Sequence, residues 1–189
     1  MTRLGAARHP IWLVRHASTA WTGVRWCGRA DPPLDAQGDA EAAALAVGLG
    51  PELPPSTTIL ASPAERALAT ARALADGMPG GLPIAVDPEL IEVDVGRVEG
   101  LTWGELSTRE PALADAIAAG DRIDWPGGES GDAVDARAAR AAARILDAAS
   151  HAPVVVVSHG AVLHAIALAL EVRPLPPPLG PAAALRIAR

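Results

Sequence analysis

The sequence predicts an α/β fold, a three-layer sandwich in which helices cover both faces of a mainly parallel central sheet. The first observation behind this prediction is a set of three short apolar runs, at residues 11–14, 57–61 and 153–157, each ending abruptly at a polar pair. Such runs are typical of strands that are buried on both faces. The second observation is that a helix-like segment follows each run, and alternating strands and helices indicate parallel strands joined by crossover helices.

The predicted helices are Ala-rich segments with apolar residues at helical spacing. One of them opens with Ser62 as its predicted N-cap and Pro63 at its first helical position, where a missing N–H costs little. Near the C-terminus, residues 182–187 are predicted as one last edge strand. The helical segments are residues 35–49, 63–75, 129–149 and 161–170.

We expect a single domain over residues 1–189, because this length suits one hydrophobic core. Residues 93–128 have weak periodicity and many Gly and Pro residues, which indicates a lid or insertion of short helices. Residues 174–181 form a Pro-rich loop. An edge strand or this loop could support a homodimer, although the sequence shows no interface signature.

Composition and charge limit the classes of partner and the compartment that we expect for this protein. The formal net charge of −6 argues against nucleic acid, whose phosphate backbone requires a basic face. The single cysteine, Cys27, excludes an intramolecular disulfide and fits a reducing compartment. Neither a signal peptide nor an apolar run long enough to span a bilayer is present. We therefore expect a cytoplasmic protein with no nucleic-acid or membrane partner.

The sequence predicts neither a metal nor a cofactor. It contains no His-Glu-x-x-His motif, no cysteine cluster and no Asp-rich loop of the kinds that hold Zn²⁺ or Ca²⁺. It also lacks a Walker loop and a dinucleotide-binding glycine fingerprint.

Polar residues follow each predicted strand: Arg15-His16, then Ser62 with Arg66 one turn on, then Ser158-His159. Ligands of such sheets bind beyond the carboxyl ends of the strands, so these segments should converge on one site. Arginine suits the oxygens of a phosphoryl group, and an imidazole can attack phosphorus.

Transfer of a phosphoryl group from an alcohol also needs a proton for the leaving oxygen. A carboxylic acid such as Glu92 could supply it and then activate water as a base. Asp94 and Glu89 are the rival candidates for this role.

Six segments in this order resemble the histidine phosphatase superfamily, in its phosphoglycerate mutase-like branch with an Arg-His-Gly signature. Ala17 stands in this chain where that signature has Gly. The resemblance spans most of the chain and implies the phosphoglycerate mutase-like form of the predicted fold. Its segments are residues 13–21, 28–38, 62–71, 90–100, 126–130 and 155–160.

The resemblance implies a role for each matched position. His16 would be the phosphorylated nucleophile, and Glu92 the general acid and base. Arg15, Arg66 and His159 would bind the phosphoryl group. Contacts with the substrate are expected from Thr22, where the family usually has Asn, from Cys27, near a usual Gln or Thr, and from Arg25, Gly28 and Gly160.

Three functions compete at this point: a metal-independent phosphatase for a small phosphomonoester, a phosphoglycerate mutase, and a non-catalytic phosphate-binding module. The mutases carry a longer, more basic insertion, which favours hydrolysis here. An intact His16 and Glu92 argue against a pure binding module. The sequence is similar to phosphatases of α-ribazole phosphate, to broad-specificity acid phosphatases and to phosphatases of sugar or glycerate phosphates. Trp103 and Trp125 are expected to fill the core, although either could line the leaving-group pocket. His164 is expected to be packed or to support the site indirectly, and not to contact the substrate.

Overall fold

The computed structural model describes residues 7–175 and 177–187. Residues 1–6 of the N-terminal segment, residue 176 of the predicted Pro-rich loop and the last two residues of the predicted 1–189 domain lie outside this description. In the described part of the chain, no helix is both long and apolar enough to cross a membrane.

The central sheet has the strand order β3-β2-β4-β1-β5. All neighbouring strands are parallel except β5, which pairs antiparallel with β1 at one edge. The predicted strands are therefore confirmed, whereas β3 was missed because its three residues are too few to show a pattern. The strands are β1 (Ile11–Arg15), β2 (Thr58–Ala61), β3 (Ile84–Val86), β4 (Val154–Ser158) and β5 (Ala184–Ile187).

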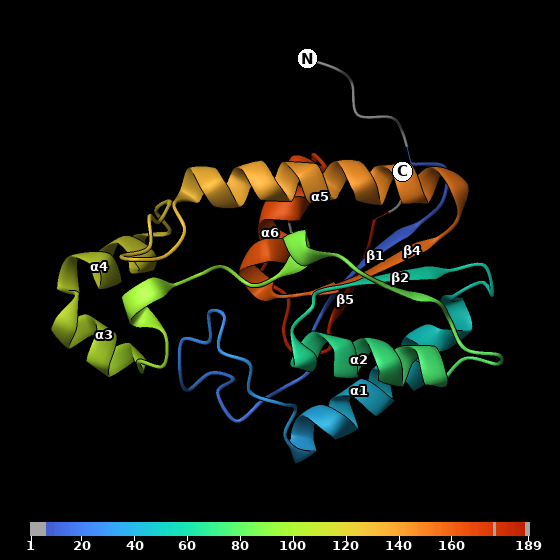
Figure 1. Ribbon diagram of the computed structural model, residues 1–189, viewed down its shortest axis with the longest axis horizontal. Coiled ribbons are helices and arrows are strands. Elements are labelled where there is room, and N and C mark those ends of the chain that lie inside the picture. The colour runs from blue at the N-terminus through green and yellow to red at the C-terminus, as the bar shows by residue number, and fades with distance from the viewer. Residues whose placement is uncertain (1–6, 176, 188–189) are drawn as a thin grey trace.

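Helices cover both faces of the sheet, which confirms the three-layer α/β sandwich (Figure 1). Because side chains alternate along a strand, β1 directs Trp12 and Val14 to one face and Ile11 and Leu13 to the other. The first face packs against α1 (Ala36–Leu49) and α2 (Glu65–Asp76). The second packs against α5 (Gly131–His151) and α6 (Gly160–Ala169).

The predicted start of α2 was wrong by two residues. Its N-cap is Ala64, and Ser62 and Pro63 lie before the helix. The Ser62 hydroxyl bonds instead to the ring of His159, 2.8 Å away, and accepts from the Ala64 N–H at 3.3 Å. A residue that reads as a helix cap thus belongs to the site at the strand ends.

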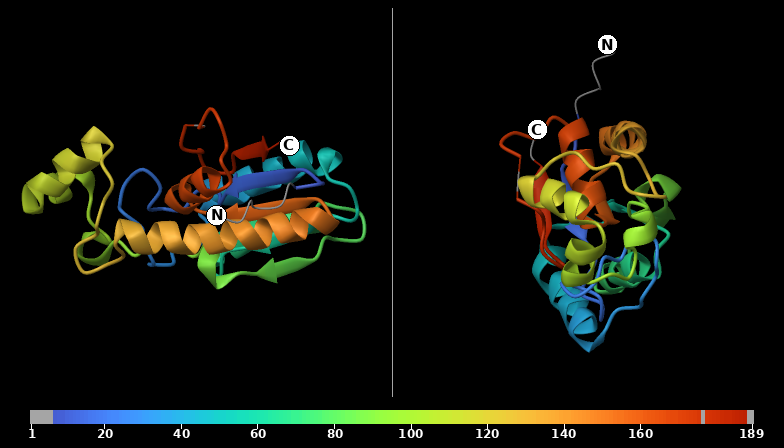
Figure 2. Two further views of the ribbon diagram at one scale, coloured as in Figure 1. Left: turned by 90° about the horizontal axis from the view of Figure 1, so that it is seen from above. Right: turned by 90° about the vertical axis from the view of Figure 1, so that its left-hand side faces the viewer.

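Residues 93–128 contain the short helices α3 (Trp103–Arg109) and α4 (Pro111–Ala119), which extend beyond one end of the sheet (Figure 2). A reciprocal backbone contact joins this segment to the loop after β1, because Trp26 N donates to Leu101 O and Gly100 N donates to Trp26 O. The Trp26 ring also lies 5.5 Å from that of Trp125. Three 3₁₀ turns complete the fold: η1 (Gly50–Glu52), η2 (Pro88–Leu90) and η3 (Gly96–Val98).

Candidate active site

The carboxyl ends of β1, β4 and β2 bring the predicted site residues together. Arg15 lies opposite Ser158 in the β1–β4 register, and His16 N then donates to Ser158 O at 2.9 Å. On the other side of β4, Ser62 N donates to Val157 O at 2.9 Å. The His16 and His159 rings consequently lie 5.0 Å apart in an edge-to-face arrangement.

His16 is held as a neutral imidazole with a defined tautomer. Its Nδ1 lies 2.7 Å from the Ala17 carbonyl, which can only accept, so Nδ1 carries the proton. Nε2 therefore has the lone pair, and it accepts from Arg66 Nε at 3.3 Å. Burial, reinforced by the charges of Arg66 and Arg15, lowers the pKa of His16 to about 3. A neutral ring with an unprotonated Nε2 is the form that can attack phosphorus, once the hydrogen bond from Arg66 is given up to the substrate.

The loop that carries His16 is fixed by partners that the sequence reading did not assign. Ala17 N donates to Thr70 Oγ1 on α2 at 3.0 Å. Ser18 donates from its backbone and its hydroxyl to the Glu41 carboxylate on α1, at 2.8 and 3.0 Å. Both helices of one layer thus hold the loop after β1 in place.

Arg66 is a fixed positive charge beside His16. Its side chain is 1% exposed, and its guanidinium donates to the carbonyls of Ala30 and Gly28 at 2.7 and 3.1 Å. Asp31 Oδ1 lies 3.3 Å from Nη1. Because these bonds set the orientation of the guanidinium in advance, it can stabilise phosphoryl charge without reorganising.

Two further polar atoms at the site are buried and have no hydrogen-bond partner in the described part of the chain: Arg15 Nε and His159 Nδ1. Arg15 is held by its Nη1, which donates to Leu179 O at 2.9 Å. His159 Nε2 lies 2.8 Å from the Ser62 hydroxyl, and we assign its ring proton to Nδ1, with Ser62 as donor to Nε2. Buried donors without partners are costly, and an anion with several oxygens would satisfy both.

Glu92 is half-buried at the same site. Burial raises the pKa of its carboxyl above the ordinary value, although the Val93 N–H bond and the charges of Arg66, Arg15 and Arg137 oppose this effect. The backbone before it is fixed by Ser158 Oγ, which donates to Leu90 O at 2.8 Å. A carboxyl group that keeps its proton into a higher pH range can serve as a general acid.

Arg137 on α5 organises the Glu92 segment. Its Nη1 donates to the carbonyls of Glu89 and Ile91 at 2.9 and 2.8 Å, while its Nε and Nη2 bind the Glu129 carboxylate. Glu129 also accepts from Asp94 N at 2.9 Å. Sequence analysis missed Arg137, because on a helix rich in Ala, Arg and Asp no pattern separates it from its surface neighbours.

Replacing Arg137 with alanine should lower the free energy of unfolding by about 3–5 kcal/mol, since a shielded carboxylate and two carbonyls lose their donor. Arg140→Ala is the matched control: its bidentate pair with Glu89 is exposed and should cost below about 1 kcal/mol. Urea unfolding of both variants measures the difference. Equal losses would contradict the role assigned to Arg137.

A cavity of about 790 Å³ opens beside His16 and the arginines at the strand ends. Glu92 lines it, whereas the rivals Glu89 and Asp94 do not. His159 and Gly28 are not among its lining residues; the His159 ring packs against that of His16, and Gly28 contributes the carbonyl that holds Arg66. The other predicted residues that line the cavity are Arg15, His16, Thr22, Arg25, Cys27, Arg66 and Gly160.

Thr22, Arg25 and Cys27 already have partners within the protein. Thr22 Oγ1 accepts from Thr19 N at 2.9 Å, and Cys27 Sγ lies 3.5 Å from Ala30 O. Arg25 Nη1 donates to Gly100 O at 2.6 Å. Of the two lid tryptophans, Trp125 lines the cavity, while Trp103 is not among its lining residues and is exposed.

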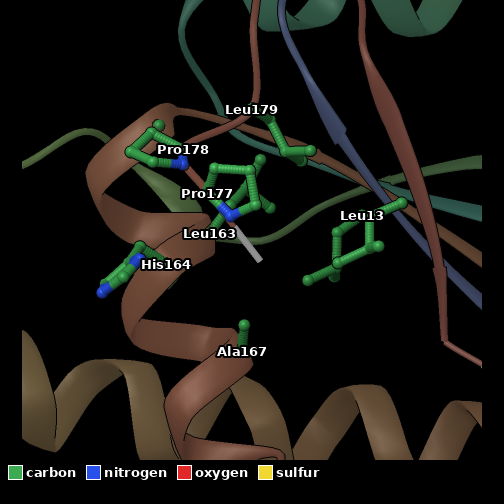
Figure 3. Close-up of a pocket in the computed structure, with 9 residues that line it drawn as sticks. Leu13, Leu163, His164, Ala167, Pro177, Pro178 and Leu179 are labelled. Carbon is green, nitrogen blue, oxygen red and sulfur yellow. The ribbon is translucent and has the colours of Figure 1, made fainter. Parts of the chain in front are cut away.

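His164 is exposed and lines the cavity, so it is not packed; that it supports the site without contacting the substrate stays a prediction. A small apolar pocket, which His164 also lines, lies between residues of α6, β1 and the Pro-rich segment (Figure 3). Pro177 and Leu179 line this pocket opposite Leu163, and the Leu179 carbonyl holds Arg15. Leu179, at the end of the Pro-rich segment, therefore holds one arginine of the site through its carbonyl.

Residues 11–179 match the histidine phosphatase superfamily, branch 1, and the chain belongs to this superfamily. Sequence relatives include a bifunctional protein of Mycobacterium tuberculosis, 36% identical over 79% of this chain, and the chain spans about 40% of that protein's length. They also include a metal-independent phosphoserine phosphatase of Arabidopsis thaliana, 35% identical over 84% of this chain and 67% of that protein.

Solved structures show the same fold. A mycobacterial glucosyl-3-phosphoglycerate phosphatase superposes with a TM-score of 0.80 at 29% identity, covering 95% of this chain and 92% of that one. A phosphoglycerate mutase from Thermus thermophilus gives 0.70 at 32% identity, covering 94% and 92%. The relatives thus include both phosphatases and mutase-like proteins, and the chain is similar to both.

Proposed function

We propose that the protein is a metal-independent phosphatase that hydrolyses a small phosphomonoester through a phosphohistidine on His16. The observation that carries this proposal is the lone pair of His16 Nε2, held beside Arg66 and the unpartnered donors of Arg15 and His159. Arginine charge can stabilise the phosphoryl oxygens without a cation. In the described ranges no three His, Cys, Asp or Glu side chains group as a metal site would require.

In the first step, His16 Nε2 attacks phosphorus and the bond from phosphorus to the ester oxygen breaks. Glu92, protonated because of its raised pKa, gives its proton to the departing oxygen. In the second step, the Glu92 carboxylate takes a proton from water, whose oxygen attacks phosphorus. The phosphorus–nitrogen bond then breaks, inorganic phosphate leaves, and His16 recovers its lone pair.

A second candidate is phosphoryl transfer between hydroxyls of phosphoglycerate, supported by the mutase-like relatives. The contacts of the lid argue for hydrolysis. Its arginines Arg97, Arg109 and Arg122 all lie within 4 Å of carboxylates and offer little charge to a second anionic group. A third candidate, a phosphate-binding module without turnover, would need neither the nucleophile nor the acid.

The proposal is tested with p-nitrophenyl phosphate and a panel of phosphomonoesters in EDTA, including α-ribazole phosphate, phosphoserine and sugar phosphates. Phosphate release without added metal is the expected result. Interconversion of 2- and 3-phosphoglycerate without phosphate release would establish the mutase instead. Binding of phosphate with neither reaction would establish the binding module.

The pH dependence follows from the two pKa shifts. Attack needs neutral His16, which is present above about pH 3, and protonated Glu92, which is lost as pH rises through a pKa above the ordinary carboxyl value. We expect a bell-shaped profile of kcat/KM whose basic limb disappears in Glu92→Gln. The second ionisation of the substrate, near pH 6, affects the pH profiles of the wild-type enzyme and of Glu92→Gln equally. An unchanged basic limb in the variant would assign that limb to another group.

A further inference from the structure

The part of the cavity beyond His16 and the arginines has an apolar wall. At about 790 Å³ the cavity falls in the range of sites for drug-sized ligands and far exceeds the space that a phosphoryl group occupies. Its wall comes from the loop after β1, the lid and α6, which places it where the alcohol part of a phosphomonoester must lie. The apolar side chains of this outer wall are Trp21, Trp26, Ile117, Ile123, Trp125 and Leu168.

The arginines of this wall already have partners within the protein. Arg122 Nη2 binds Asp132 and Asp135, and its Nε is also 3.2 Å from Asp135. Arg25 donates to Gly100 O and lies 3.8 Å from Glu105. Among the described lining residues, these are the arginines outside the phosphoryl site, and Asp121 and Asp135 add negative charge beside them.

We propose that the physiological substrate is the phosphomonoester of a neutral alcohol with an aromatic or bulky apolar group. This inference rests on the phosphatase function proposed above and narrows its substrate class. Tryptophan faces gain free energy by covering apolar surface and by stacking on rings. A carboxylate or second phosphate in the same place would lose water and meet arginines that are already bound to acids. The site should therefore reject phosphoglycerates.

The first test compares kcat/KM for 1-naphthyl phosphate and 3-phosphoglycerate, measured as inorganic phosphate released at equal ionic strength. We expect naphthyl phosphate to be favoured by at least about 10²-fold, as several buried apolar contacts and one rejected charge would give. If 3-phosphoglycerate is hydrolysed equally well or better, the inference is overturned while the phosphatase function stands. If neither releases phosphate, the proposed function itself fails.

A second test removes the two carboxylates that pair with Arg122 in the outer wall. In Asp132→Asn/Asp135→Asn, Arg122 loses its carboxylate partners, and the ratio of the two kcat/KM values should shift at least about tenfold toward 3-phosphoglycerate, through KM. Adding Arg122→Ala should cancel this gain. Asp115→Asn, which removes an exposed charge from α4 outside the cavity, is the matched control and should leave the ratio unchanged. A ratio that does not move in the double variant, or moves equally in the control, would contradict the compensation of Arg122.

Discussion

His16→Ala is expected to lower kcat for phosphomonoester hydrolysis by at least about 10⁴-fold, because removal of a covalent nucleophile leaves only binding and electrostatic stabilisation. No neighbouring group is placed to replace it. His159, the other ring of the pair, has its Nε2 bound to the Ser62 hydroxyl and its proton on Nδ1, so it presents no free lone pair to phosphorus. Steady-state assays at saturating substrate, with a thermal melt to verify folding, measure the effect.

The control for this experiment is His151→Ala. That histidine is exposed at the end of α5 and bonds only within its own turn in the described structure, so its removal should leave kcat within about twofold. A folded His16→Ala enzyme that retains more than about a tenth of the wild-type kcat would rule out a nucleophilic role for His16.

Glu92→Gln is expected to lower kcat for an alkyl phosphate by about 10²–10⁴-fold, the usual contribution of a general acid. The amide cannot donate a proton to a poor leaving group, and it cannot activate water in the second step. With p-nitrophenyl phosphate, whose phenolate leaves unprotonated, the first step should stay fast. The variant should then show a burst of one p-nitrophenol per enzyme, followed by slow turnover limited by dephosphorylation.

Glu89→Gln is the matched control, because Glu89 is three residues away but pairs with Arg140 and does not line the cavity. This variant should show the same burst and the same steady-state turnover of p-nitrophenyl phosphate as the wild-type enzyme. Equal loss of kcat on alkyl and nitrophenyl substrates in Glu92→Gln, without a burst, would show that Glu92 acts by charge alone. A loss of kcat in Glu89→Gln as large as that in Glu92→Gln would show that Glu92 is not specifically the general acid.

Much of this fold was predictable because its strands are buried on both faces and read as continuous apolar runs. The convergence of Arg15, His16 and Arg66 also followed from sequence, since parallel strands present their carboxyl ends at one edge. The three-residue strand β3 was not predictable, because it gains its regularity from pairing with β2. The start of α2 was misjudged because the Ser62 hydroxyl serves His159 in preference to a helix cap.

The residues that hold the site loops in place were harder to predict from the sequence. Glu41, Thr70 and Arg137 act through contacts between elements that are distant in sequence, and as isolated residues they are ordinary helix positions. His164 lies on a largely apolar helix, which favoured packing, but it is exposed and lines the cavity. Such roles depend on which helix faces pack together, which local pattern does not specify.

The most direct test of the phosphohistidine mechanism is to trap the covalent intermediate. Enzyme mixed with excess p-nitrophenyl phosphate would be quenched in alkali within milliseconds, which preserves a phosphorus–nitrogen bond, and digested for mass spectrometry. The mechanism predicts one phosphoryl group on His16 Nε2 that accumulates in Glu92→Gln and is lost on mild acid treatment. Phosphate release by the wild-type enzyme with no phosphoryl group on His16 in either enzyme would contradict it and indicate direct attack by water.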